Sequence, residues 1–275
     1  MRHAHLLLLG GTGSRGRATT MMRGPGTGRA LVLQHLAAEG PGAIGDHLTA
    51  AGMSLTVVEL DDGEPIPAAL DEFDLMVVMG GPMDVWQEAL HPWMAAEKAA
   101  IRRWVRDLGR PYVGVCLGHQ LLADALGGDV GPMTKPEIGL MEIELTPAGL
   151  ADPAFCRLPS PFYGLQWHGA QVRRPPPQGV VLASNEHCAI QALRVGRWAW
   201  GVQFHLEVGQ DTVPEWSLVP EYRATLESLG HGDSDWLGAA VTSHLPAMRH
   251  NTDRLLSAIL TSVLRQPDRR AGAVT

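Results

Sequence analysis

A cysteine between two glycines is the most informative feature of the sequence. Residues 111–128 read Pro-Tyr-Val-Gly-Val-Cys-Leu-Gly-His-Gln-Leu-Leu-Ala-Asp-Ala-Leu-Gly-Gly, an apolar strand running directly into a helix. Gly114 and Gly118 permit a tight reversal that pushes Cys116 into a strained, exposed position, the pattern of a nucleophile elbow. At a helix N-terminus the dipole and the free N–H groups favour the thiolate. We therefore predict that Cys116 is a nucleophile, although a lone cysteine is more often a buried apolar residue.

A candidate base and a residue to orient it follow 89 residues later. Residues 200–207 read Trp-Gly-Val-Gln-Phe-His-Leu-Glu, so His205 ends an apolar strand and Glu207 lies two positions on. A cysteine hydrolase needs a base that receives and returns a proton, and a group that orients the base. We predict these roles for His205 and Glu207. Cys156 and Cys188 lack such surroundings and are interpreted as structural.

A glycine pair supplies a candidate oxyanion hole. Met79-Gly80-Gly81-Pro82 follows an apolar strand at residues 75–79. Acyl transfer needs N–H donors that point at the developing oxyanion. The N–H groups of Gly81 and Leu117 are the candidates, although Gly-Gly-Pro alone is typical of an ordinary turn.

Together, and in this order along the chain, these three segments resemble the class I (triad-type) glutamine amidotransferases, in particular the glutaminase domain of GMP synthetase. The resemblance covers residues 30–208. It implies a glutaminase that forms a γ-glutamyl thioester on the cysteine and releases ammonia and glutamate. It also implies substrate-binding roles for Gly80, Gln120, His168 and Gly169. Two departures are Leu206, where the family usually has proline, and Ala170, where relatives often carry a polar residue.

Three functions remain open on the sequence. The first is a free-standing amidotransferase whose ammonia goes to a separate synthetase subunit, because the chain has neither a Ser-Gly-Gly-type pyrophosphatase loop nor a Gly-x-x-x-x-Gly-Lys-[Ser/Thr] phosphate loop. The second is a γ-glutamyl peptidase or hydrolase with the same triad. The third is a non-catalytic regulatory or binding protein on the same fold.

The elements that must position these residues follow an α/β pattern. Short apolar runs alternate with amphipathic helical stretches, which predicts a doubly wound, mostly parallel, flavodoxin-like sheet flanked by helices. Strands are expected at 30–33, 55–60, 75–79 and 112–115, with helices at 43–51 and 92–108 that end at Gly52 and Gly109. After Gly128, strands are expected at 138–145, 162–167, 180–183, 189–195 and 198–204, in the same sheet or in an antiparallel layer. Helices are expected beyond Glu221, including 251–264.

The domain organisation is simple. Residues 1–28 are expected to be a flexible extension, 29–265 the amidotransferase-like domain and 266–275 a C-terminal tail. Gly11, Gly13 and Gly16 spell G-x-G-x-x-G within the extension, but no amphipathic helix follows, so we interpret this dinucleotide-type pattern as chance.

The composition favours a small-molecule substrate, L-glutamine or a γ-glutamyl compound. The net charge of −7 provides no attraction for nucleic acid or anionic membranes. No apolar run approaches the ~18 residues of a membrane span, and three cysteines do not suggest a disulfide framework, so a cytoplasmic protein is expected. The twelve histidines lack ligand-like spacing, and we expect no metal or other cofactor.

Overall fold

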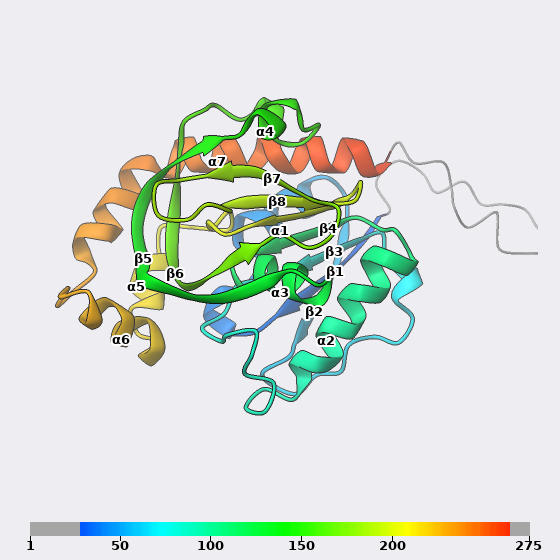
Figure 1. The fold of residues 1–275 in the computed structure, drawn as a ribbon, viewed down its shortest axis with the longest axis horizontal. Helices are drawn as coiled ribbons and strands as arrows, with labels where there is room; N and C mark the ends of the chain where they lie inside the picture. Colours follow the sequence, from blue (N-terminus) through cyan, green and yellow to red (C-terminus); the bar gives the residue numbers. More distant parts are fainter. Residues whose placement is uncertain (1–27, 265–275) are drawn as a thin grey trace, which may run out of the picture.

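The computed structural model describes residues 28–264, and a large sheet with helices on both faces forms its centre (Figure 1). The strands are β1 (Arg29–Gln34), β2 (Ser54–Glu59), β3 (Leu75–Val78), β4 (Tyr112–Val115), β5 (Asp129–Leu145), β6 (Phe162–Arg174), β7 (Gly179–Ser184), β8 (Ala192–Val195) and β9 (Ala199–Val202). Within the described residues they form one nine-stranded sheet in the order β2-β1-β3-β4-β9-β8-β7-β5-β6. This confirms the predicted α/β fold with a central sheet flanked by helices.

The sheet has a parallel half and an antiparallel half. Strands β2, β1, β3, β4 and β9 run parallel to one another. The pairs β9–β8, β8–β7, β7–β5 and β5–β6 are antiparallel, so the segments after residue 128 extend the same sheet. In open sheets of this kind, ligands bind beyond the carboxyl ends of the parallel strands. Cys116 follows β4 and His205 follows the neighbouring β9, so the topology brings the two residues to one edge.

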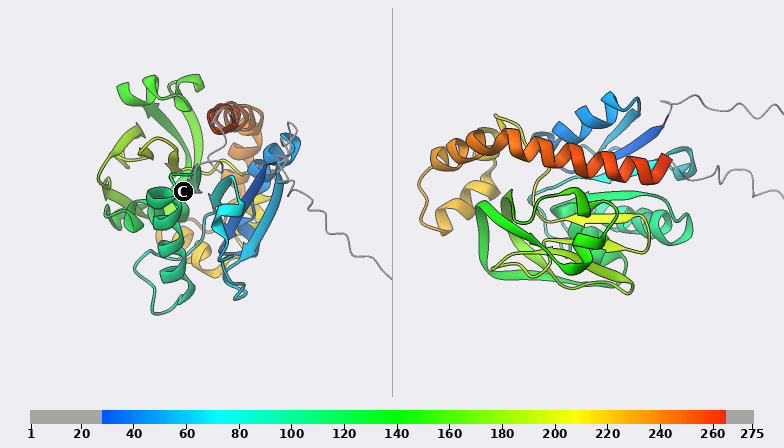
Figure 2. Two further views of the ribbon diagram at one scale, coloured as in Figure 1. Left: turned by 90° about the vertical axis from the view of Figure 1, so that its right-hand side faces the viewer. Right: turned by 90° about the horizontal axis from the view of Figure 1, so that it is seen from above.

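Helices cover both faces of the sheet. The α-helices of the described residues are α1 (Gly42–Ala50), α2 (Trp93–Arg102), α3 (Leu117–Ala125), α4 (Pro147–Ala151), α5 (Thr212–Trp216), α6 (Pro220–Ser228) and α7 (Asp235–Leu264). Helices α1 and α7 lie on one face and α2 and α3 on the other (Figure 2). Apolar side chains of α1 and of the second half of α7 belong to one cluster, and those of α2 and α3 belong to another. None of the helices in the described part of the chain has the length and apolar character needed to cross a membrane.

The parallel half is apolar on both faces because helices cover both of them. Successive side chains of a strand point to opposite faces. In β1, Ala30 and Val32 belong to the cluster that includes α1 and α7. Leu31 and Leu33 belong to the cluster that includes α2 and α3. All four are 0% exposed, which explains why the strand reads as an unbroken apolar run.

A third apolar cluster joins the C-terminal helices to β5 and β6. Trp167 of β6 meets Trp216 of α5 edge-on, with ring centroids 5.9 Å apart, and lies 5.5 Å from the ring of Tyr222 on α6. The ring of Trp216 also lies 4.5 Å from that of His205. The C-terminal helices therefore cover the edge of the sheet at which the candidate catalytic residues lie.

Three elements are longer than their sequence patterns predicted. The strand expected at 162–167 is β6, which continues to Arg174 because its second half pairs with the start of β5. The helix expected from residue 251 begins at Asp235 and continues through Pro246, because apolar residues on both sides of the proline pack in the third cluster. The strand expected from residue 138 begins at Asp129, where paired β6 residues supply hydrogen bonds that the glycine and prolines of 131–136 do not signal. Gly52 and Gly109 have φ values of 81° and 57°, as helix-ending glycines do.

Three sequence features fall outside the described residues. Residues 1–27 and 265–275 include nearly all of the expected extension, the whole expected C-terminal tail, and the glycines at 11, 13 and 16.

Candidate active site

Cys116 occupies a strained turn between β4 and α3. Its backbone has φ 50° and ψ −103°, a conformation that residues other than glycine rarely adopt. A Cβ on Gly114 would lie 2.5 Å from the Gly118 carbonyl oxygen, and a Cβ on Gly118 would lie 2.2 Å from the Val78 oxygen. Both glycines are therefore required for the turn. The sequence predicted an exposed position, but Cys116 is only 4% exposed because the C-terminal helices cover this edge of the sheet.

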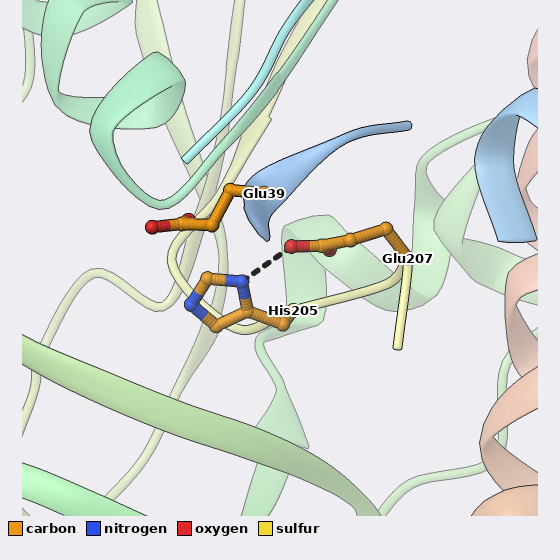
Figure 3. Close-up of side chains that lie close together, drawn as sticks. All are labelled: Glu39, His205 and Glu207. Carbon is orange, nitrogen blue, oxygen red and sulfur yellow. Dashed lines mark hydrogen bonds and ion pairs between the residues drawn. The ribbon is translucent and has the colours of Figure 1, made fainter. Parts of the chain in front are cut away.

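His205 and Glu207 lie beside this turn. The N–H of Cys116 donates to the Val202 carbonyl at 2.8 Å, which fixes the ends of β4 and β9 side by side. The N–H of His205 donates to the Leu165 carbonyl at 3.0 Å, so the chain beyond β9 is tied to β6. His205 Nδ1 and Glu207 Oε1 are 2.6 Å apart, and a dashed line marks this contact in Figure 3. The carboxylate thus orients the ring through Nδ1 and leaves Nε2 available, with no hydrogen-bond partner among the described residues.

Leu206 replaces the proline expected between these two residues without disturbing their contact. Its side chain is 5% exposed and packs in the cluster with α1 and α7. Its carbonyl accepts a hydrogen bond from Thr252 Oγ1 of α7 at 3.0 Å. Tertiary packing and this hydrogen bond hold the segment where a proline would have restricted it.

The charges around Cys116 oppose one another. Burial raises the pKa of its thiol, and the nearby His205 acts to lower it. Burial alone lowers the pKa of His205, but the Glu207 carboxylate and Cys116 raise it well above its usual value. A proton is therefore well held on His205, and the thiolate at Cys116 depends on that neighbouring charge as well as on the helix N-terminus.

The two candidate oxyanion donors lie next to the thiol. Leu117 is the first residue of α3, and a Cβ on Gly81 would lie 3.1 Å from Leu117 Cδ2. Within the described residues, neither N–H donates a hydrogen bond. Both N–H groups are therefore free to bind an acceptor.

A pocket of about 220 Å³ opens onto Cys116. Its lining comes from the loop after β3, the turn at Cys116 with helix α3, strands β5 and β6, and helix α6. Its lining residues are Gly81, Pro82, Met83, Asp84, Trp86, Cys116, Gln120, Pro132, Trp167, His168, Gly169, Ala170, Glu221, Tyr222 and Thr225. The charged side chains among them are the acidic Asp84 and Glu221, and no lysine or arginine is present.

Of the four residues assigned to the substrate by resemblance, Gln120, His168 and Gly169 line this pocket. Gln120 Nε2 donates to the Ala170 carbonyl at 3.1 Å and to Gln203 Oε1 at 3.2 Å. No described residue bonds to Gln120 Oε1. Both ring nitrogens of His168 are engaged, with the Ala170 carbonyl and with Glu137, each at 2.9 Å. The His168 ring therefore fixes the part of β6 around Gly169.

Gly80, the fourth residue, lies behind the pocket instead of lining it. A Cβ on Gly80 would lie 2.1 Å from Glu39 Oε2 and 3.3 Å from His205 Cε1. The site thus contains a second buried carboxylate, at the end of η1 (Ala37–Glu39), that sequence reasoning missed. Glu39 Oε1 accepts a hydrogen bond from the Tyr222 hydroxyl of α6, and Oε2 has no hydrogen-bond partner among the described residues.

Three further polar residues were missed. Gln203 Nε2 donates to the sulfur of Cys116 at 3.5 Å. His35 contacts the Gly80 carbonyl and the Glu97 carboxylate, each at 2.9 Å. His35 and Glu39 follow β1 at the carboxyl edge of the sheet, and a polar residue at that edge is the signal that could have found them.

Glu39, His205 and Glu207 also form a group whose possible ligand atoms lie within 4.8 Å of one another. A cation would find three donors there. However, Nδ1 of His205 is already hydrogen-bonded to Glu207, and one oxygen of Glu39 to Tyr222. This arrangement fits the orientation of a base better than the binding of a metal.

Comparison with known proteins points to one family. A model described as glutamine amidotransferase class-I matches residues 42–214. The glutamine amidotransferase-like protein YfeJ of Salmonella typhimurium is 36% identical over 154 residues, 55% of this chain and 64% of that protein. The glutamine-hydrolyzing GMP synthase of Aeropyrum pernix is 37% identical over 163 residues, 57% of this chain but 29% of that protein. The matched segment thus spans less than two thirds of either relative.

Solved structures agree with this match. A glutamine amidotransferase from Thermotoga maritima superposes with a TM-score of 0.75 at 26% identity, covering 87% of this chain and 99% of the other. A glutamine amidotransferase from Methylobacillus flagellatus superposes with a TM-score of 0.77 at 26% identity, covering 88% and 97%.

Proposed function

Because the chain belongs to the class I glutamine amidotransferase family, we propose that it hydrolyses the side-chain amide of L-glutamine to glutamate and ammonia. The observation that carries the proposal is the arrangement around Cys116. A cysteine with φ 50° at a helix N-terminus adjoins a histidine whose other ring nitrogen is held 2.6 Å from a buried carboxylate. Nucleophile, base and orienting group are the parts that amide cleavage by covalent catalysis requires.

The first half of the reaction forms a thioester. His205 Nε2 holds the proton taken from Cys116 Sγ, and the resulting thiolate attacks the amide carbon, whose carbonyl oxygen becomes an oxyanion. The N–H groups of Gly81 and Leu117 donate to this oxygen, and one such donor is worth roughly 2.7–4 kcal/mol of barrier. His205 then returns the proton to the amide nitrogen, the C–N bond breaks and ammonia leaves. A γ-glutamyl thioester remains on Cys116.

The second half restores the enzyme. A water molecule gives a proton to His205 and attacks the thioester carbon, and the same two N–H groups bind the second oxyanion. The C–S bond breaks, glutamate leaves and the proton returns to the sulfur. Glu207 stays ionised throughout, because its task is to orient the ring and stabilise the imidazolium.

The pocket supports a γ-glutamyl substrate. Its acidic residues, Asp84 and Glu221, are candidates for binding the α-ammonium group. Gln120 Oε1 and the backbone of Gly169 offer further polar contacts. The α-carboxylate would bind to N–H groups, because the lining contains no lysine or arginine.

We further propose that a separate synthetase subunit receives the ammonia. The support is similarity to proteins named as one subunit of the glutamine-hydrolyzing GMP synthase, of which that from Sulfolobus acidocaldarius is 36% identical over 140 residues. Those residues are 50% of this chain and 70% of that protein.

The test is release of ammonia and glutamate from L-glutamine by the purified chain and by Cys116→Ala. Equal amounts of both products from the wild type, and neither from the variant, would support the proposal. Cys116-independent release, or none with glutamine, would refute it.

A second candidate is hydrolysis of γ-glutamyl amides of diamines, which keep one free ammonium group, by the same residues. The observation in its favour is the acidic character of the pocket, which suits a substrate with a cationic part better than a second carboxylate. A panel of γ-glutamyl amines and γ-glutamyl dipeptides beside glutamine would separate the two. Cleavage of the amines without cleavage of glutamine would favour the second candidate.

A further inference from the structure

A buried ion pair lies directly behind the Gly80–Gly81 peptide. His35 Nε2 is 2.9 Å from Glu97 Oε1, and both side chains are 0% exposed. His35 Nδ1 is 2.9 Å from the carbonyl oxygen of Gly80. Trp93 stacks on the His35 ring at 5.2 Å with an interplanar angle of 21°, which fixes the plane of the ring.

Both partners of the ring are acceptors. A carbonyl oxygen accepts only, and an ionised carboxylate accepts only, so His35 satisfies both when each ring nitrogen carries a proton. Burial alone lowers the pKa of His35, but the Glu97 carboxylate and the Gly80 carbonyl raise it above its usual value. The second oxygen of Glu97 has no hydrogen-bond partner in the described part of the chain, so the carboxylate relies on His35. The geometry therefore fits an imidazolium between a carboxylate and a peptide carbonyl.

The peptide that accepts this bond includes the candidate oxyanion donor. In a trans peptide the C=O and N–H groups are coplanar and point in opposite directions. A donor that fixes the Gly80 carbonyl on one side consequently fixes the Gly81 N–H on the other. A charged donor at the carbonyl also polarises the peptide and strengthens its N–H as a donor.

We propose that the Glu97–His35 pair positions and polarises the Gly80–Gly81 peptide, so that the Gly81 N–H stabilises the oxyanion formed during acylation of Cys116. His35 and Glu97 are positioning residues that act through the backbone of Gly80. This inference rests on the proposed function, of which it explains one part. A purely structural role, in which the pair only ties β1 to α2, is the alternative.

Two reagents separate these roles. Acylation of Cys116 by p-nitrophenyl acetate passes through an oxyanion, and alkylation by iodoacetamide does not. Loss of oxyanion stabilisation therefore slows the first reaction and leaves the second unchanged. Neither reagent requires a γ-glutamyl substrate, so the comparison is independent of substrate identity. Peptide mass spectrometry measures both rates at Cys116, with the exposed Cys156 as an internal reference and the buried Cys188 as a reporter of unfolding.

The main variant is His35→Leu with Glu97→Leu. It removes both charges together, because removal of one partner leaves an uncompensated buried charge. We expect acylation of Cys116 to fall by about tenfold to hundredfold, with alkylation unchanged and Cys188 unlabelled. Glu97→Gln preserves the shape of the pair and removes only the charge, so a smaller fall in acylation is expected. The control is His47→Gln, which breaks a 2.9 Å pair with Asp253 elsewhere and should leave both rates unchanged.

Two results would overturn the inference. Both apply to a variant whose Cys188 stays protected. The first is an equal fall of the acylation rate and the alkylation rate at Cys116, and the second is no fall of either rate. If the double variant labels at Cys188, Glu97→Gln decides, and an unchanged ratio of acylation to alkylation would overturn the inference. Failure of the proposed function would give a different result. In that case Cys116 of the wild-type chain would react with both reagents no faster than Cys156.

Discussion

The carboxylate of Glu39 and the ring of His205 lie together, although Glu39 follows β1 and His205 follows β9 (Figure 3). Their possible ligand atoms, with those of Glu207, are within 4.8 Å of one another. Burial raises the pKa of Glu39 to about 7, while His205 and the Tyr222 hydroxyl oppose that shift. A second carboxylate at the site therefore titrates near neutral pH.

Glu39 should make stability depend on pH. Its folded-state pKa of about 7 exceeds the unfolded value of 4.5, so the folded protein binds the proton more tightly. This contribution is complete below pH 4.5 and is lost as pH rises through about 7. Urea unfolding of the wild type and Glu39→Gln should show a difference in unfolding free energy that falls by on the order of 3 kcal/mol between about pH 5 and about pH 8. A difference that stays constant would contradict this account.

Tyr222→Phe should raise the pH at which the stabilising contribution of Glu39 is lost. The Tyr222 hydroxyl donates to Glu39 and lowers its pKa, so its removal should raise the pKa further. It should also cost about 1–3 kcal/mol of stability, because a buried polar group loses a partner. Tyr163→Phe is the matched control, since Tyr163 is 44% exposed and should change stability by less than about 0.5 kcal/mol. Equal effects of the two substitutions would refute the assigned contact.

Gly80→Ala should damage stability and activity together. The new Cβ would lie 2.1 Å from Glu39 Oε2 and 3.3 Å from His205 Cε1, so the carboxylate must move. Overpacking of this kind costs about 1–3 kcal/mol. Gly232→Ala, whose Cβ would meet nothing within 4 Å, is the control. Adding Glu39→Ala should relieve the clash, and a double variant no more stable than Gly80→Ala would count against this explanation.

Cys116→Ala and Glu207→Gln should differ in the activity that remains. Alanine removes the attacking atom and should abolish hydrolysis with the fold intact. Glutamine can still hydrogen-bond to His205 but disfavours the correct tautomer and the imidazolium, so kcat should fall by up to about 10⁴-fold and remain measurable. Steady-state assays of both variants, with circular dichroism as the check on folding, make the comparison. Equal losses would contradict the assigned roles.

Local sequence was enough to predict the strained turn that carries Cys116, whose role as a nucleophile stays a prediction. Gly114 and Gly118 indicate the turn at Cys116, because a side chain at either position would clash with the adjacent backbone. The apolar runs predicted β1, β3 and β4 within a residue or so of their observed bounds. The Cys116–His205 pairing could be inferred because each follows a strand of a parallel sheet.

Residues that act through long-range packing could not be predicted. Glu39 reaches His205 only because η1 packs beneath helix α5, where Trp216 Nε1 donates to the Ala38 carbonyl at 3.0 Å. Glu97 lies within a helix and nothing in its local pattern distinguishes it from a solvated residue. Its role depends on the stacking of α2 against the end of β1, which is a property of the assembled fold.

The most direct test of the central claim is detection of the covalent intermediate. The wild-type chain is mixed with L-glutamine and quenched with acid within milliseconds to seconds, and the Cys116 peptide is examined by mass spectrometry. The account predicts a mass increase of one γ-glutamyl group on that peptide, absent from Cys116→Ala and greater in Glu207→Gln if hydrolysis of the thioester becomes slower than its formation. Turnover of glutamine with no modification of Cys116 in any variant, or with the group on another residue, would contradict it.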